Sequence, residues 1–218
     1  MNTETRIQQA SIRLLLAYGY DKTSMEDIAN EAGVARSTIY TKWKSKEDLF
    51  SALLWQEALS FAREWYRLVE ADPKGGSFSG IYKNSLLAIR HNPFIQALYT
   101  QNRRILGSFI SYDQFSRLMN DRLVWTTTLF EMMQAEGLIR ADVDAKTAAQ
   151  MAVAFRQGLL LEDLEPPGSG YEDVIDLFTA MFRDYLELEN PGEKGKEMLK
   201  AYVEKLQEQY EGFRLQGQ

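Results

Sequence analysis

The stretch at residues 23–50 reads TSMEDIANEAGVARSTIYTKWKSKEDLF and predicts two short helices joined at a glycine. Ser24 and Asp27 have the spacing of a capping pair for a helix over 25–32, in which apolar residues recur every three or four positions. Gly33 is expected to end this helix, because glycine adopts the left-handed C-cap conformation without steric cost. Two helices around such a turn form a helix-turn-helix, whose second helix can enter the major groove of DNA.

The second helix, expected over 36–43, carries hydrogen-bond donors and cations on its outward face. These residues are Arg36, Ser37, Thr38, Tyr40, Thr41 and Lys42. A helix face that is only solvated usually mixes Glu with Lys, whereas this segment contains no carboxylate. Donors and cations suit phosphate oxygens and base edges, so the segment is a candidate recognition helix. The alternative is a capped three-helix bundle whose basic face is simply exposed to water.

A third helix is expected to begin at Ser45, because Ser45 and Asp48 again have the spacing of a capping pair. Lys44 and Lys46 lie beside its first N–H groups, and a helix N-terminus favours a bound phosphate. An apolar stripe extends this helix to about residue 71, well past the helix-turn-helix. A displacement at its far end can therefore tilt the second helix.

The ordered motifs of this stretch resemble the DNA-binding signature of the tetracycline-repressor (TetR) family of transcriptional regulators. The matching elements are Thr23-Ser24 before Asp27-Ile28-Ala29, then Ala32-Gly33-Val34, Thr38-Ile39-Tyr40 and KSKEDL at 44–49. The resemblance covers residues 6 to about 50, and the remainder agrees only in length and helical character. Ala35 departs from it, since members often carry a Ser or Thr cap there. Glu26 also departs, since many members carry a basic residue at that position.

The resemblance implies a role for each exposed residue of the motif. The implied DNA-binding set is phosphate-positioning Thr38, Tyr40 and Lys46, base-facing Arg36, Ser37 and Thr41, Lys42 at their edge, and Ser24. By the same resemblance, the protein would be a homodimer on a palindromic double-stranded operator.

The chain as a whole predicts an all-α fold, because none of its 218 residues lie in a strand-like alternation of any length. Residues 1–50 are expected to form the helix-turn-helix DNA-binding domain, and residues 51–218 a larger helical ligand-binding and dimerisation domain. A second apolar stripe near the C-terminus predicts an extra helix at about 193–213. The helices expected between these are 79–90, 93–107, 113–136, 145–162 and 171–189.

Two of these helices, 145–162 and 171–189, are apolar over more than one face. Such a helix can bury one face in its own subunit and offer the other to a partner. The resemblance implies that the pair forms a four-helix homodimer interface. The alternative is simple burial of both faces within one subunit.

The middle of the chain supplies the candidate residues for a small-molecule effector. These are Trp65, Phe94, Tyr99, Arg103, Trp125 and Phe155. The aromatic members predict an apolar or aromatic compound, and Arg103, Arg104 or Arg156 would meet an anion. Aromatic residues at helical spacing belong to a core more often than to a pocket, so burial is the competing interpretation.

The composition of the chain argues against several other functions. There is one His and no Cys, which excludes thiol chemistry, the common metal-ligand sets and Ser-His nucleophile pairs. Neither an enzyme nor a bound metal or cofactor is therefore expected. No apolar run approaches the ~18 residues of a membrane span, so a cytoplasmic protein without a membrane partner is expected.

The net charge of −6 is unevenly distributed along the chain. Residues 1–50 carry seven Lys/Arg and seven Asp/Glu, so the acidic excess lies entirely in residues 51–218. A local patch of cations is what DNA binding requires, and the overall charge decides little. Because one DNA-binding domain carries few cations, two such domains are needed for useful affinity for DNA, which again favours a dimer.

These observations predict a homodimeric, sequence-specific DNA-binding regulator, acting as a repressor, that a small-molecule ligand releases from its operator. The alternative is a helical protein-interaction module that kept the helix-turn-helix shape but no longer binds DNA. Binding to duplex DNA that weakens steeply as salt rises distinguishes the regulator from the module.

Overall fold

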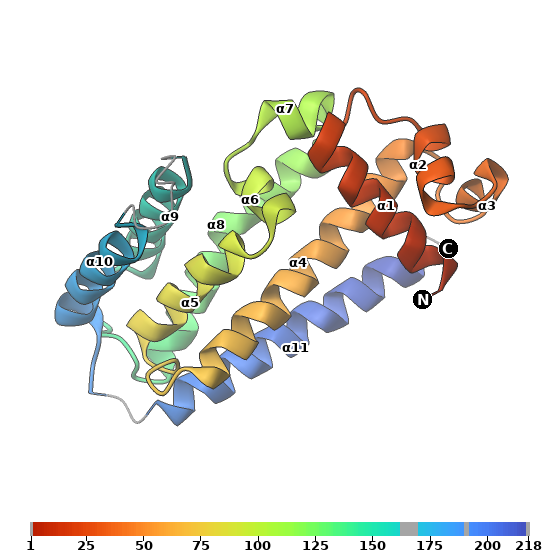
Figure 1. The fold of residues 1–218 in the computed structure, drawn as a ribbon. Coiled ribbons are helices and arrows are strands. Elements are labelled where there is room, and N and C mark those ends of the chain that lie inside the picture. Colours follow the sequence, from red (N-terminus) through yellow and green to blue (C-terminus); the bar gives the residue numbers. More distant parts are fainter. Residues whose placement is uncertain (1, 162–169, 190–191, 217–218) are drawn as a thin grey trace.

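The computed structural model describes residues 2–161, 170–189 and 192–216, which are helical apart from connecting segments and one isolated bridge (Figure 1). The helices in chain order are α1 (Thr3–Tyr18), α2 (Met25–Ala32), α3 (Arg36–Tyr40), α4 (Lys46–Ala71), α5 (Phe78–Arg90), α6 (Pro93–Tyr99), α7 (Arg103–Leu106), the 3-10 helix η1 (Gly107–Ser111), α8 (Asp113–Ala135), α9 (Ala145–Leu161), α10 (Tyr171–Leu186) and α11 (Glu193–Gln216). The expected all-α fold class is confirmed. Within the described ranges, no helix has the length and apolar character needed to cross a membrane.

The helix expected over 93–107 is divided in the structure into α6 and α7. Gln101 has a φ of +50°, a left-handed conformation that a continuous α-helix does not contain. Asn102 then caps α7, because its side-chain oxygen accepts hydrogen bonds from the N–H groups of Arg104 (3.1 Å) and Ile105 (3.3 Å). The break redirects the chain so that α7 packs against α1.

The helix expected over 171–189 ends earlier, at Leu186, where the chain becomes extended. Ile139 and Glu187 form an isolated antiparallel bridge, and the Arg140 N–H donates to the carbonyl oxygen of Leu186 (2.9 Å). These backbone bonds replace the last turn of the helix. They fasten the end of α10 to the segment that follows α8.

The first of two apolar cores joins the N-terminal helices to segments far away in sequence. α1, α2, α3 and the N-terminal half of α4 share this core with α6, α7 and η1. The ring centroid of Tyr20 lies 4.8 Å from that of Phe50 and 5.2 Å from that of Phe109. The helix-turn-helix is therefore supported by residues 89–115 as well as by α4.

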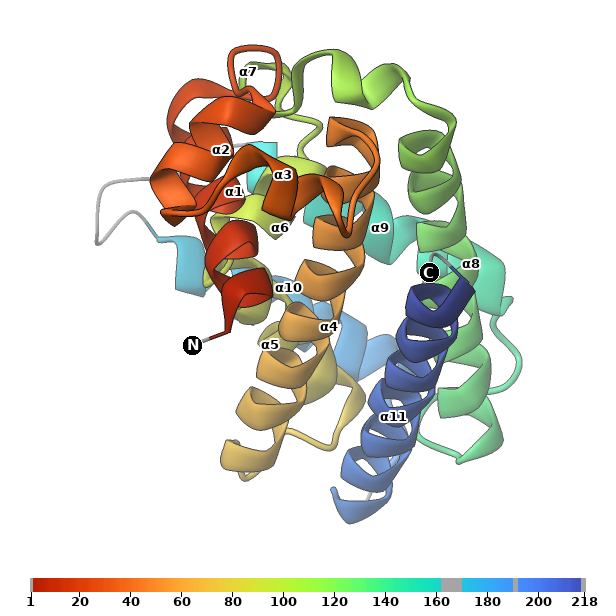
Figure 2. The same ribbon diagram turned by 90° about the vertical axis from the view of Figure 1, so that its right-hand side faces the viewer.

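The second core contains the C-terminal half of α4 together with α5, α8, α9, α10 and α11. α11 runs alongside α4 in both views (Figures 1 and 2). α9 and α10 lie on the opposite side of the molecule from α3 (Figure 1). Because α4 contributes Leu53 to the first core and Trp65 to the second, one rigid element connects the two.

Two glycines determine how closely α11 approaches the turn after α4. A Cβ added to Gly195 would lie 1.7 Å from the carbonyl oxygen of Gly76, and a Cβ added to Gly76 would lie 1.5 Å from that of Gly192. Both obstacles are backbone atoms, so no side-chain rotation relieves them. The start of α11 is thus in direct backbone contact with the α4–α5 turn.

The substitution Gly195→Ala tests this contact. By helix propensity alone, Ala in place of Gly inside a helix is favourable by about 1 kcal/mol. The steric conflict with Gly76 should reverse that sign and lower the free energy of unfolding by about 1–3 kcal/mol, as overpacking does. The exposed Ala201 on the same helix calibrates propensity, since Ala201→Gly should cost about 1 kcal/mol. Urea unfolding of both variants measures the two effects, and a more stable Gly195→Ala protein would contradict the contact.

Candidate DNA-binding surface and effector cavity

Capping interactions stabilise both ends of α2. The Asp27 N–H donates to Ser24 Oγ (3.1 Å) and the Ser24 N–H donates to Asp27 Oδ2 (2.8 Å), which completes the expected capping box. These hydrogen bonds lower the pKa of the Asp27 carboxyl. At the other end, Gly33 has the left-handed φ of +63°, and the Arg6 guanidinium donates to the carbonyl oxygen of Ala32. The Ser24 side chain, expected to touch DNA, here stabilises the helix that supports the recognition helix.

α3 is shorter than the helix expected over 36–43, because it ends at Tyr40. Ala35 supplies no side-chain cap, which removes about 1 kcal/mol of support from a helix start. At the other end, Thr41 Oγ1 donates to the carbonyl oxygen of Thr38 (2.7 Å) and the next residue's N–H bonds in the tighter i→i−3 pattern. The buried Ile39 anchors the short helix to the first core.

The outward face of α3 carries the donors and cations expected there. Arg36, Ser37, Tyr40, Thr41 and Lys42 are exposed, and Thr38 is half-buried. Arg36 Nη2 donates to the Tyr40 hydroxyl (3.2 Å), with the guanidinium carbon 5.4 Å from the centre of the ring. This hydrogen bond, and more weakly the nearby Glu26 carboxylate, raise the pKa of Arg36. Glu26 therefore lies close enough to the recognition face to interact electrostatically with Arg36.

Two cations of the expected DNA-binding set are engaged within the protein. The Lys42 ammonium forms an ion pair with Glu4 on α1. The Lys46 ammonium donates to the carbonyl oxygens of Tyr20 (2.8 Å) and Thr23 (3.0 Å) and lies 3.9 Å from the centre of the Tyr20 ring. Burial lowers the pKa of Lys46. The sequence suggested an outward-facing Lys46, but its side chain turns back onto the loop between α1 and α2.

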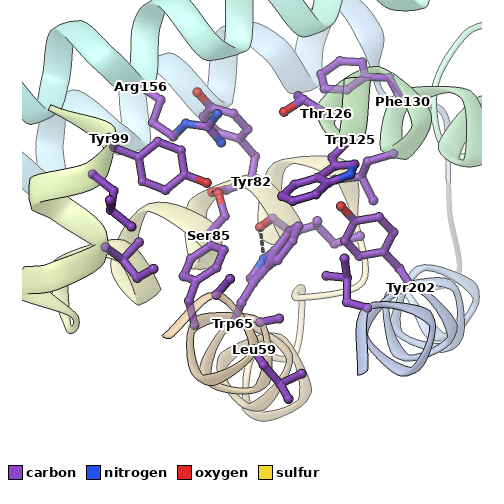
Figure 3. A pocket seen from close by; sticks show the side chains of 18 of the residues that line it. Leu59, Trp65, Tyr82, Ser85, Tyr99, Trp125, Thr126, Phe130, Arg156 and Tyr202 are labelled. Atoms are coloured by element: carbon purple, nitrogen blue, oxygen red, sulfur yellow. Dashed lines mark hydrogen bonds between the residues drawn. The ribbon is translucent and has the colours of Figure 1, made fainter. Parts of the chain in front are cut away.

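A cavity of about 130 Å³ lies between α4, α5, α6, α8, α9 and α11 (Figure 3). Its walls are mostly aromatic and aliphatic side chains. The polar or aromatic residues among its described lining are Trp55, Phe61, Trp65, Phe78, Tyr82, Ser85, Tyr99, Trp125, Thr126, Phe130, Arg156 and Tyr202. Trp65 Nε1 donates to the carbonyl oxygen of Ile81 (2.8 Å), so this indole is fixed in the wall.

Three of the six expected effector residues line this cavity, and three lie elsewhere. Trp65, Tyr99 and Trp125 converge on it from α4, α6 and α8. Phe94 is buried in the first core, Arg103 is exposed at the start of α7, and Phe155 stacks on Phe178 of α10. Phe94 and Phe155 pack as core residues, which is the competing interpretation that the sequence left open, whereas Arg103 is a surface residue.

The cation of the cavity is Arg156, the next residue along α9 from Phe155. Its side chain is only 8% exposed, and its guanidinium carbon lies 4.6 Å from the centre of the Tyr99 ring. The extra helix α11 adds Tyr202 and Leu206 to the wall. The sequence predicted the apolar stripe of α11 but not the place where it packs. Only the packing of α11 against α4 and α8 brings this stripe to the cavity.

An exposed apolar surface lies on α9 and α10. On α10, Val174, Leu177, Met181 and Tyr185 face solvent at three- and four-residue spacing, while Ile175 and Phe182 are buried on the opposite face. Leu177, Met181 and Tyr185 are each more than 60% exposed. Met151 and Leu161 on α9 are exposed to a similar extent. We call these residues of α9 and α10 the α9–α10 face.

The sequence signature described as "Bacterial regulatory proteins, tetR family" matches residues 7–53, which comprise most of α1, all of α2 and α3, and the start of α4. Through this match, residues 7–53 resemble the DNA-binding domain of TetR-family regulators. The matched residues are those of the helix-turn-helix and its supports, and they exclude the cavity.

Among similar proteins, the uncharacterized HTH-type transcriptional regulator YvkB of Bacillus subtilis is 39% identical to this chain over 56 residues. This match covers 26% of the chain and 30% of YvkB, so the chain spans less than a third of that relative's length. GusR of Salmonella enterica has a TM-score of 0.63 at 23% identity, over 84% of this chain and 94% of GusR. FadR of Bacillus subtilis, solved in complex with stearoyl-CoA, has a TM-score of 0.61 at 16% identity, over 81% of this chain and 97% of FadR. At these identities the two structures show a shared fold.

The inward position of Lys46 leads to a prediction for stability. Lys46→Ala should lower the free energy of unfolding by about 1–2 kcal/mol, because two charge-assisted hydrogen bonds to loop carbonyls are lost. Lys44→Ala, at an exposed position two residues away, is the matched control and should leave stability unchanged. Thermal and urea unfolding measure both, and equal stability of the two variants would show that the Lys46 bonds contribute nothing.

Proposed function

We propose that this protein is a homodimeric, sequence-specific DNA-binding regulator that a small-molecule ligand releases from a palindromic operator, thereby acting as a repressor. The observation that carries the proposal is the exposed, carboxylate-free donor face of α3, mounted on a helix-turn-helix with both helices anchored in the first core. The match of residues 7–53 to the tetR family signature supports the DNA-binding role.

The contacts with DNA divide between the two edges of α3. Arg36, Ser37 and Thr41 would reach base edges in the major groove, and Thr38 and Tyr40 would hold the sugar-phosphate backbone. The Arg36–Tyr40 hydrogen bond holds the guanidinium above the face before DNA arrives. Lys46 keeps one of its three N–H donors for a phosphate after bonding Tyr20 and Thr23. Lys42 would exchange Glu4 for a phosphate at the edge of the face.

A dimer is supported by the α9–α10 face. Its residues are large, apolar and exposed, and a row of such residues on one helix marks a protein interface more often than a free surface. Packing two copies of this face would give a four-helix interface on the side away from α3. In such a dimer, paired recognition helices fit successive major grooves roughly 34 Å apart.

The cavity is positioned to couple a ligand to DNA binding. Its walls include Leu54, Leu59 and Trp65 of α4, and the same helix carries Leu49 and Phe50 in the core of the helix-turn-helix. A ligand that prefers a shifted position of α4 would draw the population away from the DNA-binding state, by no more than its differential affinity for the two states. The likeness to FadR, which was solved with stearoyl-CoA, supports a ligand within this helical fold.

Single substitutions on α3 test the DNA-binding role. Tyr40→Phe removes a hydroxyl expected at a phosphate and should weaken binding to all duplexes by a similar factor. Arg36→Ala removes a base contact and should relax preference at one or two positions, at a cost of about 1–3 kcal/mol on the preferred sequence. Selection from a random duplex library, followed by affinity measurement at several salt concentrations, reads out both effects. If wild-type protein binds no duplex even at low salt, the interaction-module alternative replaces the regulator.

The dimer has its own test in the substitution Leu177→Arg. A charge in the middle of the α9–α10 face should shift the protein from dimer to monomer in sedimentation analysis, because a buried unpaired cation is unfavourable. Val124→Arg is the matched control, since Val124 is an exposed apolar residue on α8 outside this face. Operator affinity should fall with loss of the dimer. A wild-type monomer at micromolar concentration would refute this part of the proposal.

A further inference from the structure

We propose that the cavity selects a compact monocarboxylate with a cyclic, preferably aromatic, body, and that Arg156 is the residue that binds its carboxylate. This inference rests on the proposed function only in taking the cavity as the effector site. It adds the chemical class of the ligand and the residue that distinguishes it from neutral compounds of the same shape.

The guanidinium of Arg156 is buried, and one of its nitrogens has no hydrogen-bond partner among the described residues. The side chain is 8% exposed, and Nη2 is fully buried and has no partner in the described part of the protein. An ionised guanidinium removed from water is strongly unfavourable unless it is paired. Arginine cannot escape this cost by losing its proton at ordinary pH. An anion that enters the cavity would supply the missing partner.

Two acids of the surrounding helices are engaged with other partners, and the described lining of the cavity contains no acid. Among the described lining residues of the cavity, Arg156 is the charged one and none is an Asp or Glu. Glu57 on α4 is half-buried but accepts a hydrogen bond from Asn92 (2.7 Å) and does not line the cavity. Asp176 on α10 is paired with Lys83 of α5. The positive charge of Arg156 is thus left for a ligand.

The surroundings of the Arg156 guanidinium determine how it can contact a ligand. Tyr99 covers one face of it, 4.6 Å from ring centre to guanidinium carbon. Figure 3 shows the Arg156 side chain between Tyr99 and Tyr82 at one end of the cavity. A stacked guanidinium presents its N–H groups edge-on, and this planar fork matches a carboxylate in a bidentate contact. Two other donors of the wall are committed, since Tyr82 Oη donates to the carbonyl oxygen of Ala152 and Ser85 Oγ donates to the carbonyl oxygen of Tyr82 (each 2.7 Å).

The remaining walls determine the body of the ligand. The rings of Trp65, Trp125 and Tyr202 line the cavity beyond the guanidinium, so an aromatic ring would stack on them. Burial raises the pKa of Tyr202 well above its usual range, which keeps this wall uncharged. The volume of about 130 Å³ is close to that of apolar protein cavities, about 150 Å³, that accept one benzene molecule. One ring plus a carboxylate is therefore the expected size.

The test uses isosteric pairs that differ in charge. The full-length protein is titrated with benzoate and benzamide, with 2-naphthoate and 2-naphthamide, and with inorganic phosphate, and binding is followed by tryptophan fluorescence and calorimetry. At least one acid should bind ten or more times tighter than its amide, and phosphate should not bind. Arg156→Gln should abolish the preference for the acid while leaving amide binding unchanged. Arg156→Lys should retain part of the preference, because it keeps the charge but loses the fork.

Two controls separate this role from a structural one. Arg140→Gln removes a surface arginine that pairs with Asp142 and should not alter the preference. Arg156→Gln should unfold at the same or a higher temperature than the wild type without ligand, because a buried unpaired charge is removed. A large drop in its unfolding temperature would assign Arg156 a structural role and overturn the inference. Equal affinity for acid and amide, a preference that survives in Arg156→Gln, or no saturable binding of either acid would also overturn it.

Duplex binding by the same preparation keeps the two proposals apart. Salt-dependent DNA binding without a preference for the acids would leave the regulator standing and remove only the assignment of Arg156. A preference for the acids without any DNA binding would leave the assignment of Arg156 standing and remove the DNA-binding regulator.

Discussion

The long helix α4 contributes side chains to both apolar cores, and the rest of the structure depends on that continuity. Its 26 residues extend about 39 Å at the ordinary rise of an α-helix. Near one end, Leu49 and Phe50 are fully buried among the helices that carry α3. Near the other, Trp65 and Val69 are buried beside α5, α8 and α11. Sharp kinks in helices arise mostly at Pro, at Gly/Ser pairs or at bulges. Because α4 contains neither Pro nor Gly, we expect a change at the cavity to move this helix as a whole.

The parts of the fold that depend on neighbouring residues could be predicted from the sequence. The capping box of Ser24 and Asp27, the left-handed turn at Gly33 and the cap at Ser45 all appear where the motif placed them. Such features are local, since donor and acceptor lie three or four residues apart. The break at Gln101 was not predicted, because a non-glycine residue with positive φ leaves no compositional signal.

The side-chain contacts of the candidate sites were harder to predict, because they depend on distant residues. Lys46 belongs to a basic cluster in sequence, yet the carbonyls that attract it lie on the loop before α2. Trp65, Tyr99 and Trp125 meet in the cavity, whereas Phe94 and Phe155, equally aromatic, pack into the protein. The packing of the helices decides which face of each helix lines the cavity. The motif at residues 23–50 contains no information about α11, which lies far outside it.

The glycine contact at the base of α11 has a consequence for how this protein tolerates length changes. Gly195 is fixed against Gly76 by backbone atoms, and Tyr202 reaches the cavity two turns further along the same helix. Each residue of a helix advances the direction of its side chains by about 100°. One residue inserted or deleted at 196–201 would therefore turn Tyr202 and Leu206 away from the cavity, while the start of α11 kept its contact with Gly76. The number of residues between Gly195 and Tyr202 therefore matters more for this side of the cavity than which residues they are.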